Sequence, residues 1–249
     1  MVRLIQLTDT HIVSQPNGTL YGVNTDNSLV RVLDHILQSR LTADAVLVTG
    51  DLVHDEGEAA YRKLASMLSR LQLPVHYLAG NHDRADILHQ CLPNSPAAGV
   101  YSFILQNWLV VMLNSAVPDK VEGYLSQETL ANLTSLLQSH PDHYILVAVH
   151  HHPVSTGSEW MDHIGISNGA ALLAVLDLFP QVRVVINGHI HQLLQAELGH
   201  YTVFGTPSTC AQFKPGQVKA GTIDAAPPGY RFLELHDDGS YHTQVFRVA

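Results

Sequence analysis

Short runs of consecutive apolar residues alternate along this chain with longer segments whose apolar residues recur every three or four positions. Some of these runs are too short to be helices of comparable burial, so we predict buried strands at residues 3–7, 45–48, 74–78, 144–149 and 182–186. Each strand is followed directly by a carboxylate, an imidazole or a carboxamide. In open α/β sheets, ligands bind beyond the carboxyl ends of the strands, so we expect these polar groups to share one site at one sheet edge.

The longer segments have the spacing of helices that cover one face of a sheet. We predict helices from Asn24 or Thr25 through residue 40, at 58–71, at 86–90, from Ser126 to residue 139, and at 169–179 with Asn168 as the N-cap. The order strand, helix, strand, helix, strand in the first third of the chain predicts parallel strands joined by crossover helices.

Antiparallel strands are predicted further along the chain. Residues 100–105 with 108–113, 194–198 with 201–204, and 230–235 with 241–248 flank turn sequences typical of hairpins. The Pro- and Gly-rich stretch 215–229 is predicted to be an exposed loop. The pattern therefore predicts an α/β fold, with one mixed and one more antiparallel sheet and helices outside both. We expect residues 1–249 to form a single domain.

The composition narrows the functional classes. With 46% hydrophobic and 14% charged residues the chain is globular, and its formal net charge of −9 disfavours a nucleic-acid partner. We find no secretory leader and no apolar run that approaches a membrane span, so we expect a cytoplasmic protein without a membrane partner. Cys91 and Cys210 are expected to be small buried thiols. The 17 histidines favour a metal site of nitrogen and oxygen ligands.

The polar groups after the predicted strands supply such ligands. The candidate metal ligands are Asp9, His11, Asp51, Asn81, His150, His189 and His191. This set exceeds the needs of one tetrahedral ion and fits two divalent ions of Mn, Fe, Zn, Co or Ni that share a bridge. Asp51, on a tight glycine turn, is the natural bridging carboxylate. If the loops stay extended, the members of each Asp-x-His or His-x-His pair point to the same side.

A pair of metal ions lowers the pKa of bound water and clamps phosphate oxygens, so we expect a bridging hydroxide to attack phosphorus. His82 is placed to protonate the leaving oxygen. In the triple histidine at 150–152, His150 leaves the strand directly and is favoured as the ligand, with His151 as the alternative.

Several further residues are candidates for the pocket. His54, His76, His89, His163 and His200 are expected to be structural, with His54 and His163 as the possible exceptions because both follow site loops. Four aromatic residues are candidates for stacking on a base, with core or interface packing as the alternative for each: Tyr21, Trp160, Phe213 and Tyr230.

The ordered motifs closely resemble those of the calcineurin-like metallophosphoesterases. The motifs are Asp9-Thr10-His11, Gly50-Asp51, Gly80-Asn81-His82-Asp83, the triple histidine at 150–152, and Gly188-His189-Ile190-His191. Within this superfamily the chain is similar to the bacterial class III 3′,5′-cyclic AMP phosphodiesterases. The finer resemblance lies in Gly-Val-Asn-Thr at 22–25 and in Thr-Pro-Ser-Thr-Cys-Ala-Gln-Phe-Lys-Pro at 206–215.

The resemblance implies a four-layer α/β/β/α sandwich with two mixed β-sheets, and a cyclic nucleotide as substrate. It implies that one metal is held by Asp9, His11, Asp51 and His191 and the other by Asp51, Asn81, His150 and His189. The phosphate would lie near His11, Asp51, Asn81, His82 and His191, and the metals would be Fe or Mn, with others possible in vitro.

Two departures from related groups refine the expectation. The purple acid phosphatases carry a Tyr three residues after the bridging Asp, where this chain has His54, so we expect two divalent ions rather than a tyrosinate-bound ferric centre. The Ser/Thr protein phosphatases have Glu where this chain has Asp83. The alternatives left open are hydrolysis of 2′,3′-cyclic nucleotides, glycerophosphodiesters or nucleotide pyrophosphates, a nuclease, and a catalytically inactive nucleotide sensor. We expect a monomer or homodimer.

Overall fold

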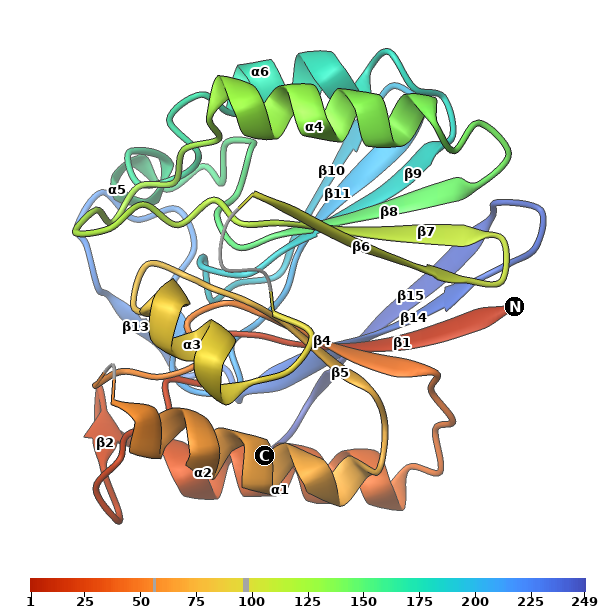
Figure 1. The fold of residues 1–249 in the computed structure, drawn as a ribbon. Coiled ribbons are helices and arrows are strands. Elements are labelled where there is room, and N and C mark those ends of the chain that lie inside the picture. The colour runs from red at the N-terminus through yellow and green to blue at the C-terminus, as the bar shows by residue number, and fades with distance from the viewer. Residues whose placement is uncertain (56, 96–98) are drawn as a thin grey trace.

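Two β-sheets lie face to face at the centre of the molecule, and helices cover the outer face of each (Figure 1). The structure is a computed structural model that describes residues 1–55, 57–95 and 99–249. The four layers confirm the α/β/β/α sandwich that the family resemblance implies. Each sheet contains parallel and antiparallel neighbours. The expectation of one mixed and one more antiparallel sheet was wrong, because the two C-terminal hairpins are divided between the sheets.

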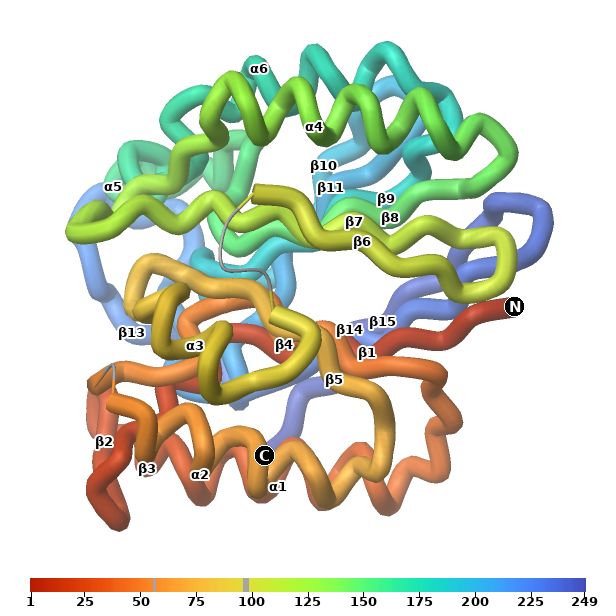
Figure 2. Tube along the Cα trace, viewed as in Figure 1, coloured from red at the N-terminus to blue at the C-terminus, as the bar shows by residue number. Residues whose placement is uncertain are grey.

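The first sheet has the strand order β15-β14-β1-β4-β5. Its parallel strands are β1 (Val2–Leu7), β4 (Ala45–Thr49) and β5 (Val75–Leu78), and the hairpin of β14 (Gly229–Leu235) and β15 (Tyr241–Arg247) extends it. Figure 2 shows that β1, at the start of the chain, lies between β4 and the C-terminal strand β14. The register pairs Leu4 with Ala45 on one side and with Leu233 on the other.

The second sheet has the order β10-β11-β9-β8-β7-β6. The strands are β6 (Val100–Leu105), β7 (Trp108–Leu113), β8 (Tyr144–Val149), β9 (Val182–Asn187), β10 (Leu194–Leu198) and β11 (Tyr201–Gly205). Strands β7, β8, β9 and β11 are parallel to one another, and the hairpin partners β6 and β10 close the two ends. All three predicted hairpins are confirmed.

Three hydrophobic layers hold the sandwich together. The middle layer lies between the sheets and includes Leu4, Leu47, Trp108, Leu146 and Val184, all fully buried. Helices α1 (Thr25–Gln38), α2 (Glu58–Leu68) and α3 (Ala85–Cys91) pack on the first sheet. Helices α4 (Gln127–Gln138) and α6 (Gly169–Leu176) pack on the second, and α5 (Glu159–Asp162) is a single turn. Because β1, β4 and β8 are covered on both faces, their sequences are nearly continuous apolar runs.

Helix caps explain the element boundaries. Asn24 caps α1 by accepting a hydrogen bond from Asn27 N at 2.8 Å, and Ser126 caps α4 in the same way. Asn168 was predicted as a cap, but its side chain instead bonds the backbone N–H and C=O of Leu125. Residues 69–71, predicted as the end of α2, form a 3₁₀ turn.

Short strand pairs lie outside the sheets. Strands β2 (Thr19–Leu20) and β3 (Val23–Asn24) form a small hairpin before α1. Strand β12 (Gln212–Phe213) pairs with β13 (Ile223–Asp224), so the stretch 215–229 is not entirely loop as predicted. Cys210 is buried as expected, but Cys91, at the end of α3, is only half-buried, and both thiols are free.

Candidate metal centre

The seven predicted metal ligands converge between the carboxyl ends of strands from both sheets. Loops after β1, β4 and β5 carry Asp9, His11, Asp51 and Asn81, and loops after β8 and β9 carry His150, His189 and His191. The prediction of a single sheet edge was therefore incomplete, since neither sheet alone supplies the set. The site depends on the alignment of the two sheets.

One group of ligands surrounds the imidazole of His11. The ligand atoms of Asp9, His11, Asp51 and His191 all lie within 4.8 Å of one another, and all four residues are buried. His191 Nε2 lies 3.3 Å from Asp9 Oδ1 and 3.3 Å from His11 Nε2, and His11 Nε2 lies 3.7 Å from Asp51 Oδ2. Two carboxylates and two imidazoles at this spacing match the donor chemistry of a divalent transition metal.

A second group of ligands lies on the other side of Asp51. Its Oδ1 atom is 3.4 Å from His150 Nε2, which is 3.3 Å from Asn81 Oδ1. The ring of His189 lies against that of His150, with centroids 5.0 Å apart. Because Oδ1 of Asp51 faces His150 while Oδ2 faces His11, the carboxylate has the arrangement that a bridge between two ions requires.

Hydrogen bonds fix which ring nitrogens remain available. Nδ1 of His150 lies 2.8 Å from Thr49 O, and Nδ1 of His191 lies 2.7 Å from Ala211 O, so each Nδ1–H donates to a carbonyl and Nε2 is the nitrogen that can bind an ion. His189 Nε2 is buried without a hydrogen-bond partner in the described ranges. A buried ring nitrogen that lacks a protein partner fits a metal ligand.

The other two histidines of the triple have different environments. His151 Nδ1 lies 2.8 Å from Ser115 Oγ and its Nε2 lies 3.0 Å from Val121 O, so both nitrogens have protein partners. This favours His150 over His151 as the ligand, although His151 lies with His150 and His189 in one close group. The ring of His152 is buried and stacks on His189 with centroids 5.8 Å apart, so it packs against that ring and helps to hold it in place.

The backbone around the ligands is left-handed rather than extended. Asp9, His11, Asp51, His189 and His191 have φ values of 52°, 44°, 49°, 67° and 50°. The expectation of extended Asp-x-His and His-x-His loops was therefore wrong. Tertiary hydrogen bonds impose the conformation, as Asp9 N donates to Gly50 O and His11 N donates to Asp51 O. Non-glycine residues at positive φ are strained, and such strain collects at functional sites.

Glycine is required at two of the turns. Gly50 has a φ of 97°, and a Cβ there would overlap the His150 ring. At Gly80 a Cβ would overlap Asp51 Oδ1 and the Asp51 backbone nitrogen. Glycine is therefore required at position 80 by close contact rather than by dihedral angle, because the loop that carries Asn81 approaches Asp51 too closely for any side chain.

Burial and charge set the protonation of the ligands. Burial lowers the pKa of His11 to about 3, against the opposing effect of Asp51, so this imidazole stays neutral. Burial alone would make Asp51 harder to ionise, but contact with His150 holds its pKa well below the usual range. Burial also opposes the charge of His150, yet Asp51 and Asp9 raise its pKa to about 9. A cation held by these residues would take over the role that the His150 proton plays in this pairing.

A polar network between the sheets supports the centre from below. The Gln6 side-chain amide donates to Thr49 Oγ1 and to Asn187 O and accepts from Thr206 Oγ1. Arg231, 2% exposed, donates from Nε to Thr206 Oγ1. These bonds join the site ends of both sheets and so hold the two groups of ligands in alignment.

The stretch 206–215 holds two of the ligand loops. Ser208 Oγ donates to Asp9 O at 2.7 Å, and Thr209 N donates to Thr8 O at 3.1 Å. The carbonyl of Ala211 receives the Nδ1–H of His191, as described above. This segment thus positions both the first and the last ligand loop, which are far apart in the sequence.

Asp83 is a positioning residue that the sequence interpretation did not single out. The carboxylate of this half-buried residue accepts hydrogen bonds from the backbone N–H groups of Leu52, Val53 and Gly80 and from the hydroxyl of Tyr61. It therefore ties the loop after β4 to the loop after β5. The position of Asp83 in the Gly-Asn-His-Asp motif could have indicated a role. Most of its hydrogen-bond donors, however, lie more than 20 residues earlier in the sequence.

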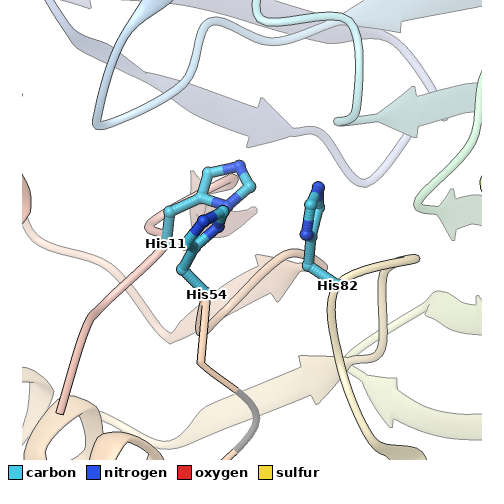
Figure 3. Close-up of side chains that lie close together, drawn as sticks. All are labelled: His11, His54 and His82. Carbon is cyan, nitrogen blue, oxygen red and sulfur yellow. The ribbon is translucent and has the colours of Figure 1, made fainter. Parts of the chain in front are cut away.

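A cavity of about 160 Å³ opens over the ligands. His82 and His54 lie at its rim beside His11, and the three imidazoles face one another (Figure 3). The ring centroid of His82 lies 5.1 Å from that of His11 and 5.2 Å from that of His54. His54 was expected to be structural with the site as the possible exception, and its place in the cavity lining shows that it is the exception.

The aromatic candidates divide between the cavity and the core. Tyr21, Trp160 and Phe213 line the cavity. Tyr230 does not, because it is fully buried on the helix side of the first sheet and stacks on Phe246. His163 is exposed and lies outside this cavity, with Nδ1 donating to Glu159 O, which agrees with the expectation that it has no role in the site. The apolar wall of the cavity, which consists of Leu20, Val121, Met161 and Ile164, was not predicted.

Comparison with known proteins places this arrangement in a family. Residues 2–193 match the family model described as calcineurin-like phosphoesterase. The chain is 37% identical to the 3′,5′-cyclic adenosine monophosphate phosphodiesterase CpdA of Pseudomonas aeruginosa, covering 99% of this chain and 90% of the relative. It is 38% identical to CpdA of Escherichia coli K12, covering 100% and 90%. A 3′,5′-cyclic-nucleotide phosphodiesterase of Nostoc is 37% identical, covering 99% and 92%.

A solved structure supports the same fold. The crystal structure of a dimetal phosphatase from Danio rerio superimposes with a TM-score of 0.73 at 14% sequence identity, covering 100% of this chain and 99% of the other. None of the helices in the described ranges has the length and apolar character needed to cross a bilayer.

Proposed function

The chain belongs to the calcineurin-like phosphoesterase family, and we propose that it is a metal-dependent phosphodiesterase that hydrolyses 3′,5′-cyclic AMP to 5′-AMP. The observation that carries the proposal is the position of Asp51, whose two carboxylate oxygens face separate groups of buried ligands. Relatives that match this chain along nearly its whole length are cyclic-nucleotide phosphodiesterases.

Divalent metal ions fit the donor set. We propose that Asp9, His11, Asp51 and His191 hold one ion, and that Asp51, Asn81, His150 and His189 hold the other. The unpartnered Nε2 of His189 within the described part of the chain and the carbonyl-bound Nδ1 atoms of His150 and His191 support this assignment. When bound, the ions lower the pKa of a water and neutralise phosphate charge. Fe or Mn are our proposed ions, with Zn, Co or Ni as substitutes, because the ligands mix imidazole with carboxylate.

The chain's own residues orient the phosphate and supply a proton. We propose that the phosphate of the substrate lies near His11, Asp51, Asn81, His82 and His191. Conversion to 5′-AMP breaks the bond between phosphorus and O3′, and the leaving oxygen needs a proton. The His82 ring lines the cavity, and its backbone N–H donates to Asp51 Oδ1 at 2.9 Å. His82 is therefore held where its imidazole can protonate O3′ as the bond breaks.

Domain organisation, partners, location and oligomeric state are also proposals. We propose that residues 1–249 act as one domain, because loops from both sheets contribute ligands to the same site. The net charge of −9 supports a small substrate over nucleic acid. Two free cysteines support a cytoplasmic location. A monomer or homodimer stays a prediction.

Two variants test the function directly. Purified protein loaded with Mn or Fe should convert 3′,5′-cyclic AMP to 5′-AMP, and Asp51→Ala or Asn81→Ala should lower kcat by at least about 1000-fold, because each removes a ligand of the reacting centre. Metal analysis should give about two equivalents for the native protein and fewer for Asp51→Ala. His140→Ala, at a half-buried position next to α4 and outside the ligand set, is the control for a generic loss of stability. Native metal loading without turnover would refute the proposal.

A substrate panel separates the proposal from its alternative. The same enzyme preparation should be assayed with 2′,3′-cyclic AMP, a glycerophosphodiester and a nucleotide pyrophosphate. We expect the highest kcat/KM for the 3′,5′-cyclic nucleotide. A higher kcat/KM for one of the others would replace the proposed substrate while leaving the metal centre intact.

A further inference from the structure

An aromatic patch adjoins the metal centre within the same cavity. The Phe213 ring stacks on the His191 ring, with centroids 4.5 Å apart and an interplanar angle of 21°. Trp160 and Tyr21 approach Phe213 edge-on, at 5.3 Å and 5.7 Å. The patch therefore begins at a proposed metal ligand and extends away from it. This is where the group attached to a metal-bound phosphate would lie.

Trp160 has an unused hydrogen-bond donor in this patch. Its indole Nε1 is buried and has no acceptor among residues 1–55, 57–95 and 99–249. A buried N–H without an acceptor costs free energy, and such groups are rare in folded proteins. A ligand that brings an acceptor into the cavity would satisfy it.

Tyr21 is held over the patch by a strained turn. It lies at the tip of the β2–β3 hairpin, where Tyr21 and Gly22 have φ values of 50° and 79°. Left-handed residues at both centres of a two-residue hairpin turn are typical of type I′, but a bulky residue with positive φ is an outlier. Tyr21 is 53% exposed, so it gains little from packing in the core. A glycine at this position would adopt the turn without the strain. Exposure and strain at one aromatic residue point to a ligand contact rather than to packing.

We propose that Tyr21, Trp160 and Phe213 form the nucleobase subsite, which rests on the proposed phosphodiesterase function. The base stacks on the ring of Tyr21, and Trp160 meets the base edge-on, so that its indole N–H donates to a ring nitrogen of the base. Base–aromatic stacking tolerates different bases because each has a π-face. A bicyclic purine covers more of the patch than a pyrimidine, so the subsite favours purine cyclic nucleotides. The indole N–H finds an acceptor nitrogen in adenine and in guanine alike.

The decisive comparison uses substrates with and without a base. Trp160→Ala and Tyr21→Ala should each lower kcat/KM for 3′,5′-cyclic AMP by about 10-fold to 100-fold. With methyl riboside 3′,5′-cyclic phosphate, in which a methoxy group replaces the base, both variants should stay within about 2-fold of the native protein. Tyr124→Ala is the matched control, because Tyr124 is 47% exposed and lies outside the cavity. Equal losses on both substrates would mean a structural role and would overturn the subsite.

A conservative variant isolates the hydrogen bond. Trp160→Phe keeps an aromatic ring and removes only the N–H, so it should lower kcat/KM for cyclic AMP by about 3-fold to 10-fold. Analogues of cyclic AMP with N1, N3 or N7 replaced by C–H should include one on which the native protein and Trp160→Phe are equal. If the ratio between the two proteins is the same for all three analogues as for cyclic AMP, the hydrogen bond is excluded.

Binding of the product separates this proposal from the function on which it rests. The chain has two tryptophans, and Trp108 is fully buried between the sheets, so 5′-AMP should quench the fluorescence of Trp160. Quenching in a protein that hydrolyses no cyclic nucleotide would refute the function and keep the subsite. If the native protein hydrolyses cyclic AMP, and Trp160→Ala and Tyr21→Ala have the same kcat/KM as Tyr124→Ala, the subsite is refuted and the function is kept.

Discussion

Replacement of Asp83 by alanine tests whether the two loops around Asp51 depend on a single carboxylate. The substitution removes the acceptor of four hydrogen bonds, which are donated by the N–H groups of Leu52, Val53 and Gly80 and by the Tyr61 hydroxyl. At a net value of about 0.5–1.5 kcal/mol for each hydrogen bond, the loss is several kcal/mol. Burial makes the ionised carboxylate itself costly, which offsets part of this. We therefore expect Asp83→Ala to lower the free energy of unfolding by about 3 kcal/mol.

The contribution of Asp83 to the free energy of unfolding should decrease as the pH rises. Burial, followed by repulsion from Asp51, raises the pKa of Asp83 from 3.8 to about 7. A raised pKa means that the folded state binds the proton more tightly than the unfolded state, so the contribution of Asp83 is fully present below 3.8 and declines as the pH rises through 7. The difference in unfolding free energy between native protein and Asp83→Ala should therefore be larger at pH 5 than at pH 8.

Urea denaturation of metal-free protein measures both effects without the contribution of bound ions. Asp86→Ala is the matched control, because Asp86 is an exposed aspartate nearby whose carboxylate pairs only at the surface, and its removal should change stability by less than about 0.5 kcal/mol. Asp83→Ala should also weaken metal binding about 10-fold to 100-fold, since it releases the loop of Asn81. If Asp83→Ala and Asp86→Ala have the same stability and metal affinity, the positioning role is wrong.

Three further predictions follow from the same structure. Burial lowers the pKa of His76 from 6.5 to about 4, so the contribution of neutral His76 to stability is present above pH 6.5 and is lost as the pH falls toward 4. His76→Phe keeps the stack on Phe103 but does not titrate, so it should lose less stability between pH 6.5 and pH 4 than the native protein, as measured by thermal unfolding. Arg231→Met should lower the free energy of unfolding by about 2 kcal/mol, because Thr206 and its neighbours lose a buried donor, and an unchanged urea midpoint would contradict this. Gly80→Ala should leave far-UV circular dichroism unchanged yet reduce the metal content, because its Cβ overlaps Asp51; native metal content would show that the loop can move aside.

The local sequence determined the elements and the identity of the ligands. Strands such as β1 and β8 are covered on both faces, so their sequences are nearly continuous apolar runs. Such runs can be recognised without knowing which segments pack against them. The caps Asn24 and Ser126 were also predictable, because a cap is satisfied by a backbone N–H three residues away. Asn168 misled the same reasoning, because its partner Leu125 lies in a distant segment.

The ligand types were predictable for a related reason. Metal chemistry restricts the donor atoms to carboxylate, carboxamide and imidazole, and parallel strands bring their carboxyl ends to a common edge. The order of motifs was therefore enough to identify Asp9, Asp51 and His191 as candidates and to indicate the family. Sequence could not decide between His150 and His151, because the difference lies in hydrogen bonds to Thr49 and to Ser115.

Only the tertiary structure decided how the ligands face one another. Each ligand group combines residues from both sheets, and the alignment of the sheets depends on contacts between residues as distant in sequence as Gln6 and Thr206. The left-handed backbone at Asp9 and His191 and the tie that Asp83 makes between two loops are likewise imposed by partners far along the chain. Apolar runs and donor types are local properties that a sequence carries directly, whereas distances and strain arise only when remote segments pack.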